Sequence, residues 1–406
     1  MSANTTMLPP LGKSGGAGEQ VSGGAAAAGK SALKTEKSGL ICRRQLCFLL
    51  AFLLPVPKLL EAPSLLAYFS KGDLLLPAFL HYVLQTAVLI ALLCACARSE
   101  KPLFQRLREA SKPLATAVYI ALAAYFIFSD MFPLLDMARF ADTVFFDTAP
   151  SVSAFLPFFL LSAFICVKDE KAIGRSADLC MPIFLFAFFG LIFMAFGETD
   201  FTELFPLLGT SPRENFKGLY HSFVHFSDMP LMIPLLGAYR YEKGDGKKIV
   251  GAYAGGGAFV LLFLAVFYGV FGALAPRETY AFDKIARYFS ALDVVGRVDL
   301  LLVYLITVVL VYAYALPLQL AVICLCGACG GADLYGEGEK NEKQKRRKRL
   351  IFSVCINGAA LIFVLFATRH YHFFYSLSTS KLFFVFPMFS VALPLSFLLL
   401  KGDKKK

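Results

Sequence analysis

Ten long apolar runs constrain most strongly what this chain can fold into. They fall roughly at residues 44–68, 74–97, 114–140, 151–167, 177–196, 218–238, 248–274, 297–327, 350–368 and 380–400. Most of them reach the roughly 18 residues that a helix needs to cross the hydrocarbon core of a bilayer. Hydrophobic residues make up 57% of the chain, which is too high a share for a water-soluble globular protein. We therefore predict an all-α polytopic membrane protein with ten transmembrane helices.

Two of these runs are interrupted at bilayer depth by prolines and a charged residue. The first run is interrupted at 54–58 (LPVPK) and the sixth at 226–230 (FSDMP). If the ten runs form two five-helix halves, the interruptions fall at corresponding positions. Unwound backbone is tolerated at that depth only where it lines a cavity or is buried in protein. The pattern predicts a 5+5 inverted-repeat transporter fold with broken helices 1 and 6 and a ligand site between the breaks.

The predicted ligand site combines the two breaks with polar residues of other spans. Asp228 is a carboxylate near the bilayer midplane, a position that costs about 2.5 to 3.5 kcal/mol on insertion scales, so it should face water, a partner or a ligand. Asp130 either faces the cavity or caps a half-helix kinked at Pro133. The candidate ligand-binding residues are Pro55, Val56, Pro57, Lys58, Asp130, His225, Ser227, Asp228 and Tyr304.

Lys58 and Asp136 each have a structural alternative on their own helix. Lys58 stands three residues before Glu61, so the two side chains can pair on a resumed helix instead of meeting a ligand. Asp136 and Arg139 have the same spacing and can neutralise each other. These alternatives remain open from the sequence alone.

The sequence gives little support for metal binding or catalysis. His221, His225 and Asp228 are spaced along one helical face and could bind a metal, but no further ligand is evident. The cysteine-rich stretch at 324–329 has no nearby histidine. The sequence contains no nucleotide-binding loop, Ser-His-Asp arrangement or zincin motif. We predict no metal, no cofactor, no catalytic residue and no enzymatic activity.

The net charge of +11 is distributed as in a membrane protein and not as in a nucleic-acid-binding protein. Lys and Arg concentrate in alternate loops, among them 98–112, 240–248 and 340–349, which predicts that both termini are cytoplasmic. The KRRKR run at 345–349 is then a topology anchor or a contact for anionic lipid. We expect 1–40 to be a disordered cytoplasmic tail, 41–400 the membrane domain and 401–406 a basic cytoplasmic tail.

The stretch at 197–209 (GETDFTELFPLLG), continued through the sixth span into the basic loop at 240–243, resembles the spore germination permeases. These are the B subunits of nutrient germinant receptors in endospore-forming bacteria. Gly296 to Asp299, at the start of the eighth span, is similar to the same family. The resemblance implies the fold of the amino acid, polyamine and organocation transporter superfamily, with the germinant between the first, third, sixth and eighth helices. It also implies a complex with receptor A and C subunits in the spore inner membrane.

The combined prediction is a germinant-sensing subunit that binds an amino acid and contributes to triggering spore germination. The ligand's carboxylate is expected at a half-helix N-terminus or at Lys58, and its ammonium group at Asp228 or at helix-end carbonyls. The alternative is a proton-coupled amino acid permease, because one fold supports both functions. The 54–58 break departs from the Gly-rich break of the resembled family.

Overall fold

The computed structural model describes residues 41–98, 103–144, 151–206, 208–242, 244–288, 298–329, 339–370, 373 and 381–399. Within these residues the regular secondary structure is entirely helical. The predicted tails at 1–40 and 401–406 lie outside the described residues, as does Arg297 of the eighth predicted span.

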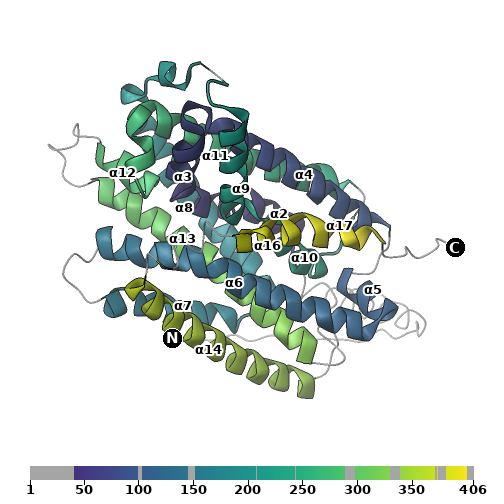
Figure 1. Ribbon diagram of the computed structural model, residues 1–406. Coiled ribbons are helices and arrows are strands. Elements are labelled where there is room, and N and C mark those ends of the chain that lie inside the picture. Colours follow the sequence, from purple (N-terminus) through teal and green to yellow (C-terminus); the bar gives the residue numbers. More distant parts are fainter. Residues whose placement is uncertain are drawn as a thin grey trace, which may run out of the picture. The chain divides into compact units, whose positions relative to one another are not determined.

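Seven helices are 16 or more residues long (Figure 1). They are α4 (Leu75–Ala97), α6 (Lys112–Val144), α7 (Ser151–Cys166), α8 (Glu170–Ala195), α11 (Asp245–Phe271), α13 (Val298–Cys329) and α14 (Glu339–Arg369). The shorter α-helices are α2 (Arg43–Phe48), α3 (Ala62–Ser70), α5 (Leu103–Ala110), α9 (Pro212–Phe226), α10 (Met229–Gly237), α12 (Ala281–Tyr288), α16 (Val385–Pro387) and α17 (Leu393–Ser396). Single 3-10 or π turns are η2 (Leu49–Leu53), η3 (Val56–Leu59), η4 (Lys71–Asp73), η5 (Phe196–Glu198), η6 (Phe201–Leu204), η7 (Gly272–Arg277), η9 (Lys381–Phe384), η10 (Met388–Ala392) and η11 (Phe397–Leu399).

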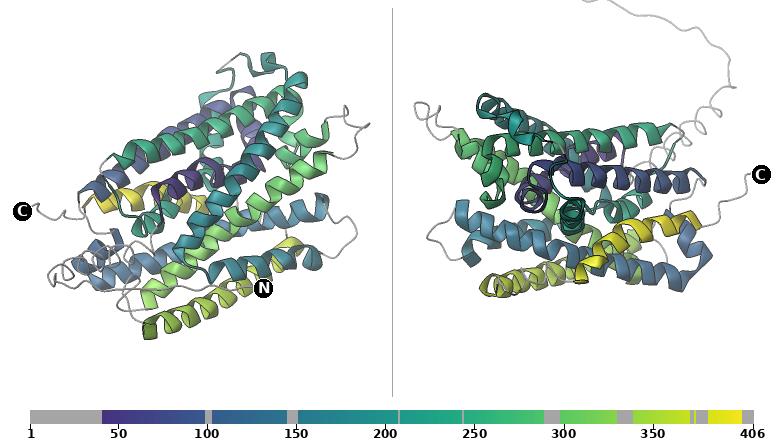
Figure 2. Two further views of the ribbon diagram at one scale, coloured as in Figure 1. Left: turned by 180° about the vertical axis from the view of Figure 1, so that it is seen from behind. Right: turned by 45° about the horizontal axis from the view of Figure 1, so that its top comes forward.

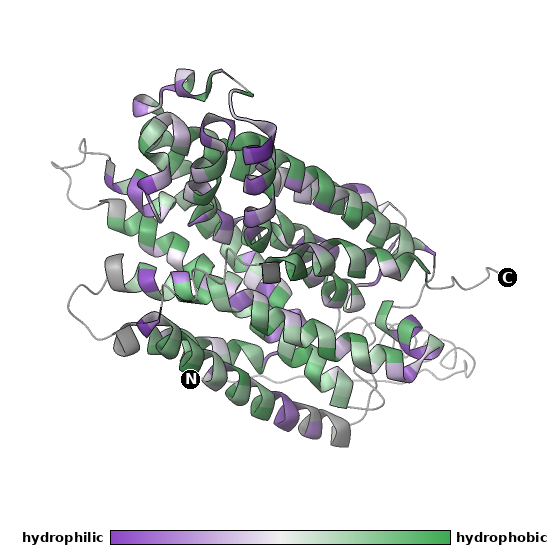
Figure 3. Cartoon of the chain, viewed as in Figure 1, coloured by the Kyte–Doolittle hydropathy of each residue, from purple (hydrophilic) through white to green (hydrophobic). Residues whose placement is uncertain are grey.

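The described helices make this a multi-pass membrane protein. Six of them are long and apolar enough to cross a bilayer, and a bent seventh span adds to them if its two halves are counted together. Figure 3 shows the long helices hydrophobic along most of their length, with hydrophilic residues gathered near the end of α14 that begins at Glu339. The fourth, sixth and tenth predicted spans are shorter, because α7 has 16 residues, the sixth is divided into α9 and α10, and Val385–Leu399 is a short apolar helix.

Helix α13 packs against α6, α7, α8 and α14. Its sequence is apolar on all sides, which is typical of a helix enclosed by other helices or lipid. Helices α6, α7 and α14 lie side by side in Figures 1 and 2 and contact one another. On the other side of the molecule α11 packs against α4, α2 and η2, and α3 packs against α9. The first broken helix therefore runs beside α8 and α11 and ends next to the second.

The first break lies slightly later than the sequence predicts. The segments Arg43–Leu59 and Ala62–Asp73 meet at a bend of 63°, so the sharpest turn is at 60–61 and not within 54–58. Pro55 has φ −64° and ψ −32°, which are helical values, because the proline ring fixes φ where a helical turn needs it. The prolines thus begin a 3-10 turn that extends the helix by four residues.

Close packing of α11 on the first broken helix depends on Gly256. A Cβ atom built on Gly256 would lie 2.7 Å from the Leu50 carbonyl oxygen and 3.1 Å from Pro55 Cγ, whereas a Cβ on Gly255 would meet nothing within 4 Å. We expect Gly256→Leu to lower the free energy of unfolding by about 1 to 3 kcal/mol, since the backbones must move apart. Gly255→Leu is the matched control and should leave the thermal unfolding midpoint of the purified protein unchanged or raised. Equal losses in both variants would contradict this packing.

Two arginines form ion pairs with acidic residues at the starts of α8 and α11. Arg349, the last residue of the predicted anchor run, is 1% exposed and donates to Glu170 Oε1 at 2.8 Å and to Asp169. It therefore fastens α14 to the start of α8 and does not face lipid. Arg43 donates to Asp245 Oδ1 at 2.8 Å, which fastens α2 to the start of α11.

Candidate functional site

The second break lies where the sequence predicts it. Helix α9 ends at Phe226, Ser227 leaves the helical region with φ −86° and ψ 68°, and α10 begins at Met229. Pro230 stands in the first turn of α10. Amide groups in a first turn have no acceptor within the helix, so a proline costs no hydrogen bond there. Ser227 and Asp228 are thereby held on a non-helical turn between two half-helices.

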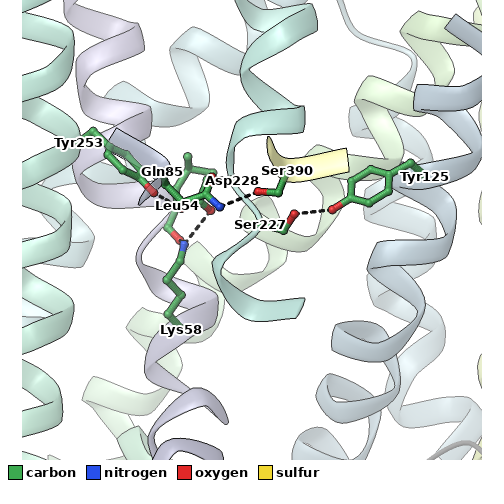
Figure 4. Close-up of polar contacts among 8 residues, drawn as sticks. All are labelled: Leu54, Lys58, Gln85, Tyr125, Ser227, Asp228, Tyr253 and Ser390. Carbon is green, nitrogen blue, oxygen red and sulfur yellow. Dashed lines mark hydrogen bonds and ion pairs between the residues drawn. The ribbon is translucent and has the colours of Figure 1, made fainter. Parts of the chain in front are cut away.

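Lys58 and Asp228 join the two broken helices through a buried ion pair (Figure 4). The Lys58 ammonium donates to Asp228 Oδ1 at 2.8 Å and to the Leu54 carbonyl oxygen at 2.7 Å. Asp228 Oδ2 accepts a hydrogen bond from the Tyr253 hydroxyl at 2.9 Å. Lys58 is 2% exposed and Asp228 4%. A buried pair with these extra hydrogen bonds compensates both charges.

A cavity of about 640 Å³, counted with the solvent space onto which it opens, lies beside this ion pair. Its lining comes from the first, third, sixth and eighth predicted spans, the four that the family resemblance implies. The lining residues are Leu53, Leu54, Pro57, Lys58, Tyr125, Ser129, Asp130, Pro133, Val224, His225, Ser227, Asp228, Leu231, Ala313, Tyr314 and Pro317. The walls are mostly apolar with a few polar groups, which is typical of a small-molecule site.

Asp130 brings to this cavity a carboxyl oxygen without a partner among the described residues. It is 2% exposed, and its Oδ2 atom has no hydrogen-bond partner in the described part of the chain. Helix α6 continues through Pro133 to Val144, so Asp130 does not cap a half-helix, and that alternative is wrong. A buried carboxyl oxygen without a partner is costly, and the group is therefore suited to bind a cation or a hydrogen-bond donor from a ligand.

Two neutral hydrogen bonds fix other polar side chains around the breaks. The hydroxyl groups of Tyr125 on α6 and Ser227 lie 2.5 Å apart. Gln85 on α4 donates to the Ser390 hydroxyl at 2.6 Å. Figure 4 shows both bonds near the Lys58–Asp228 pair. The Tyr125 bond ties the turn of the second break to α6, the helix that carries Asp130.

Six of the nine candidate site residues line the cavity: Pro57, Lys58, Asp130, His225, Ser227 and Asp228. Pro55 and Val56 are buried in the packing around the first break instead. Tyr304 is 54% exposed and is not among the lining residues. Tyr314, on the same helix, takes the place that the sequence analysis gave to Tyr304.

Tyr125, Ser129 and Tyr314 are lining residues that the sequence analysis missed. Ser129 adjoins Asp130, and Tyr125 lies five residues before Asp130 on the same helix. The polar residues around Asp130 in an otherwise apolar span were the signal that could have found the first two. Tyr314 had no such signal, because tyrosines also occur on other faces of α13.

The alternative partner that the sequence offers for Lys58 is not the one that the structure shows. Lys58 pairs with Asp228, while the Glu61 carboxyl group lies beside that of Asp136, with Arg139 close by. The alternative in which Lys58 pairs with Glu61 is therefore wrong.

The candidate metal-binding face of the sixth span is divided by the break. The His221 ring stacks on Phe69, with ring centroids 4.8 Å apart, while Asp228 turns to Lys58. No group of three or more His, Cys, Asp or Glu side chains among the described residues is arranged to hold a metal ion.

The loop that carries the family resemblance is held by carboxylates. Asp200 accepts hydrogen bonds from the Thr202 hydroxyl and amide, and these bonds lower the pKa of Asp200. Asp73, at the end of the first broken helix, accepts from the amides of Leu208 at 2.6 Å and Thr210 at 2.7 Å. The loop is thus fastened to the half-helix that follows the first break.

Taken together, the broken helices and the cavity between them define a transporter-like membrane protein. The family model described as spore germination protein matches residues 77–326, well over half of the chain. The chain belongs to this spore germination protein family. Among solved structures, it is similar to MhsT in complex with L-phenylalanine, with a TM-score of 0.59 and 14% identity over 89% of each chain. That likeness concerns the fold. No curated protein matches the chain.

Proposed function

We propose that this chain is a germinant-sensing membrane subunit that binds an amino acid in the central cavity and contributes to triggering spore germination. The observation that carries the proposal is the pairing pattern of the cavity's charges. Lys58 and Asp228 compensate each other, whereas Asp130 Oδ2 has no partner among the described residues. Membership of the spore germination protein family and the fold shared with MhsT, solved with L-phenylalanine, support the same reading.

The cavity offers separate partners for the two charged groups of an amino acid. The ligand's ammonium group pairs with Asp130 and not with Asp228, because Asp228 is already bound by Lys58 and Tyr253. An ammonium group has three N–H donors, and Leu54 and Asp228 accept two of those of Lys58. The third N–H of Lys58, together with the positive N-terminal end of α10, serves the ligand's carboxylate.

The ligand's side chain would meet the apolar part of the lining. Val224 and Leu231 flank the second break, and Ala313 and Pro317 approach from α13. These residues offer contact area without charge, so they set the size of side chain that fits. His225 and Ser227 add polar groups at one edge.

The membrane arrangement in this proposal is the one that the sequence predicts. Ten helices in two inverted five-helix halves carry the two breaks at corresponding positions, and both termini are cytoplasmic. The chain works with receptor A and C subunits in the spore inner membrane. Signalling requires only that the amino acid binds one of two conformations more tightly than the other.

A ligand panel tests the proposal directly. The full chain, purified in detergent or lipid nanodiscs, is heated with each of the common L-amino acids, and its unfolding midpoint is recorded. We expect one amino acid or a few of similar size to raise the midpoint in a saturable way. Spores that lack the gene should fail to germinate with the same amino acids, measured as the fall in optical density. Absence of any saturable rise, together with normal germination of those spores, would overturn the proposal.

The permease alternative has a separate readout. If the chain is a proton-coupled permease, liposomes that contain it accumulate the radiolabelled amino acid when a proton gradient is imposed. The sensor proposal expects binding without accumulation. The same protein preparation serves both measurements, so a failure of uptake is not confused with a failure of folding.

A further inference from the structure

The Lys58 ammonium is bound by a main-chain carbonyl and a carboxylate, the same kinds of group that bind a free metal cation at a helix break. In an α-helix the amide of Lys58 would donate to the Leu54 carbonyl, but in the 3-10 turn it donates to the Pro55 carbonyl at 3.0 Å. The carbonyl of Leu54 is therefore open at the position where the helix changes its winding. The ammonium of the same residue, Lys58, fills it at 2.7 Å.

The other contacts of the ammonium come from the second broken helix. Asp228 supplies a carboxylate oxygen at 2.8 Å, and the centroid of the Phe226 ring lies 5.9 Å from the nitrogen. A main-chain carbonyl, a carboxylate and an aromatic ring are all groups that attract a cation. These contacts leave the positive charge almost fully enclosed, since Lys58 is 2% exposed.

In folds with broken helices, unwound carbonyls and helix ends coordinate coupling ions such as Na⁺ near the substrate. The residues at this pair of breaks do not fit a Na⁺ ion. The Leu54 carbonyl and one Asp228 oxygen are bound to the ammonium, and Tyr253 binds the other Asp228 oxygen. A second buried cation at the same place would also be repelled by the first.

We propose that the Lys58 ammonium is a tethered cation that takes the place of a dissociable coupling ion between the two breaks. A dissociable ion stabilises the folded protein only when its concentration exceeds its dissociation constant. A covalently attached ammonium is present at every salt composition. The pair of broken helices in this chain is therefore organised without Na⁺.

The test uses salts alone on the purified full chain. Unfolding midpoints are measured in sodium chloride, methylammonium chloride and choline chloride at equal ionic strength. The wild-type midpoint should be the same in all three. In Lys58→Ala the Asp228 carboxylate and the Leu54 carbonyl are left without their cation, so sodium or methylammonium should raise the midpoint by several degrees over choline, with saturation.

The double variant Lys58→Ala/Asp228→Asn is the matched control. It lacks the carboxylate that would hold an added cation, so its midpoint should again be the same in the three salts. A sodium-specific rise in the wild type would overturn the inference, as would a rise of equal size in the single and double variants. If Lys58→Ala does not fold in any salt, the wild-type measurement decides: a sodium-independent midpoint supports the inference and a sodium-specific rise overturns it.

This inference concerns the cavity of the proposed function but does not depend on an amino acid. The salt measurements contain no amino acid, and the ligand panel can be run in choline chloride. The salt measurements can therefore contradict the tethered-cation inference while the ligand panel supports amino acid binding. The ligand panel can likewise contradict amino acid binding while the salt measurements support the inference.

Discussion

Lys58→Met alone should lower the free energy of unfolding by about 3 to 5 kcal/mol, because it leaves the Asp228 carboxylate buried without its ammonium partner. Asp228→Asn alone leaves the ammonium unpaired and should have an effect of similar size. Both side chains are almost fully enclosed, so solvent cannot replace the lost partner. The measurement is the denaturant or thermal unfolding of each purified variant, together with its abundance in the membrane.

The double variant Lys58→Met/Asp228→Asn should recover most of the lost stability, since it leaves neither charge unpaired. Lys58→Met/Glu61→Gln is the matched control and should recover nothing, because Lys58 pairs with Asp228 and Glu61 lies beside Asp136 instead. Recovery with Glu61→Gln and none with Asp228→Asn would mean that the ion pair within the first helix, and not the one between the breaks, holds Lys58.

The sequence predicted the breaks better than it predicted their contacts. The second break follows from Asp228 and Pro230 within an apolar run, and it lies at the predicted residues. The first break was predicted too early in the sequence. A proline was taken to interrupt the helix, although its fixed φ also suits the start of a new helical turn. Which of these outcomes a proline gives depends on the 3-10 winding around it, and that winding is set by packing against neighbouring helices.

The Lys58–Asp228 pair could not be read from spacing along one helix. The two residues are 170 positions apart, whereas the sequence analysis considered only Glu61, at helical spacing, and a ligand as partners of Lys58. The predicted site between the two breaks is consistent with a contact between Lys58 and Asp228, one residue from each break. A pairing between breaks depends on the relative rotation of two half-helices, which local periodicity does not define.

Tyr304 was predicted in place of Tyr314 for a different reason. The ten residues between them correspond to about 2.8 helical turns, so the two rings leave α13 in different directions. An amphipathic pattern would show which direction faces the protein, but α13 is apolar on every side. Helices of this kind carry no sequence signal for their buried face.

Asp130→Asn should weaken the response to the amino acid by about 2 kcal/mol or more, about thirtyfold in the concentration needed. The amide keeps the shape of the side chain but removes the charge that pairs with the ligand's ammonium group. Its stability should be equal to or above that of the wild type, because the substitution replaces a buried carboxyl group that is costly to ionise and whose Oδ2 atom has no partner among the described residues. The measurement is the amino acid concentration for half-maximal germination, or for half-maximal thermal stabilisation of the purified protein.

Asp136→Asn is the matched control for Asp130, since it makes the same change on the same helix outside the cavity lining. The amide can donate a hydrogen bond to Glu61, which lies beside residue 136, so the response should stay at the wild-type concentration. A loss in the Asp136 variant as large as in the Asp130 variant would assign the effect to α6 as a whole. A normal response of Asp130→Asn at normal abundance would exclude Asp130 from the site. The ligand's ammonium group would then need another partner, because the Asp228 carboxylate is bound by Lys58 and Tyr253.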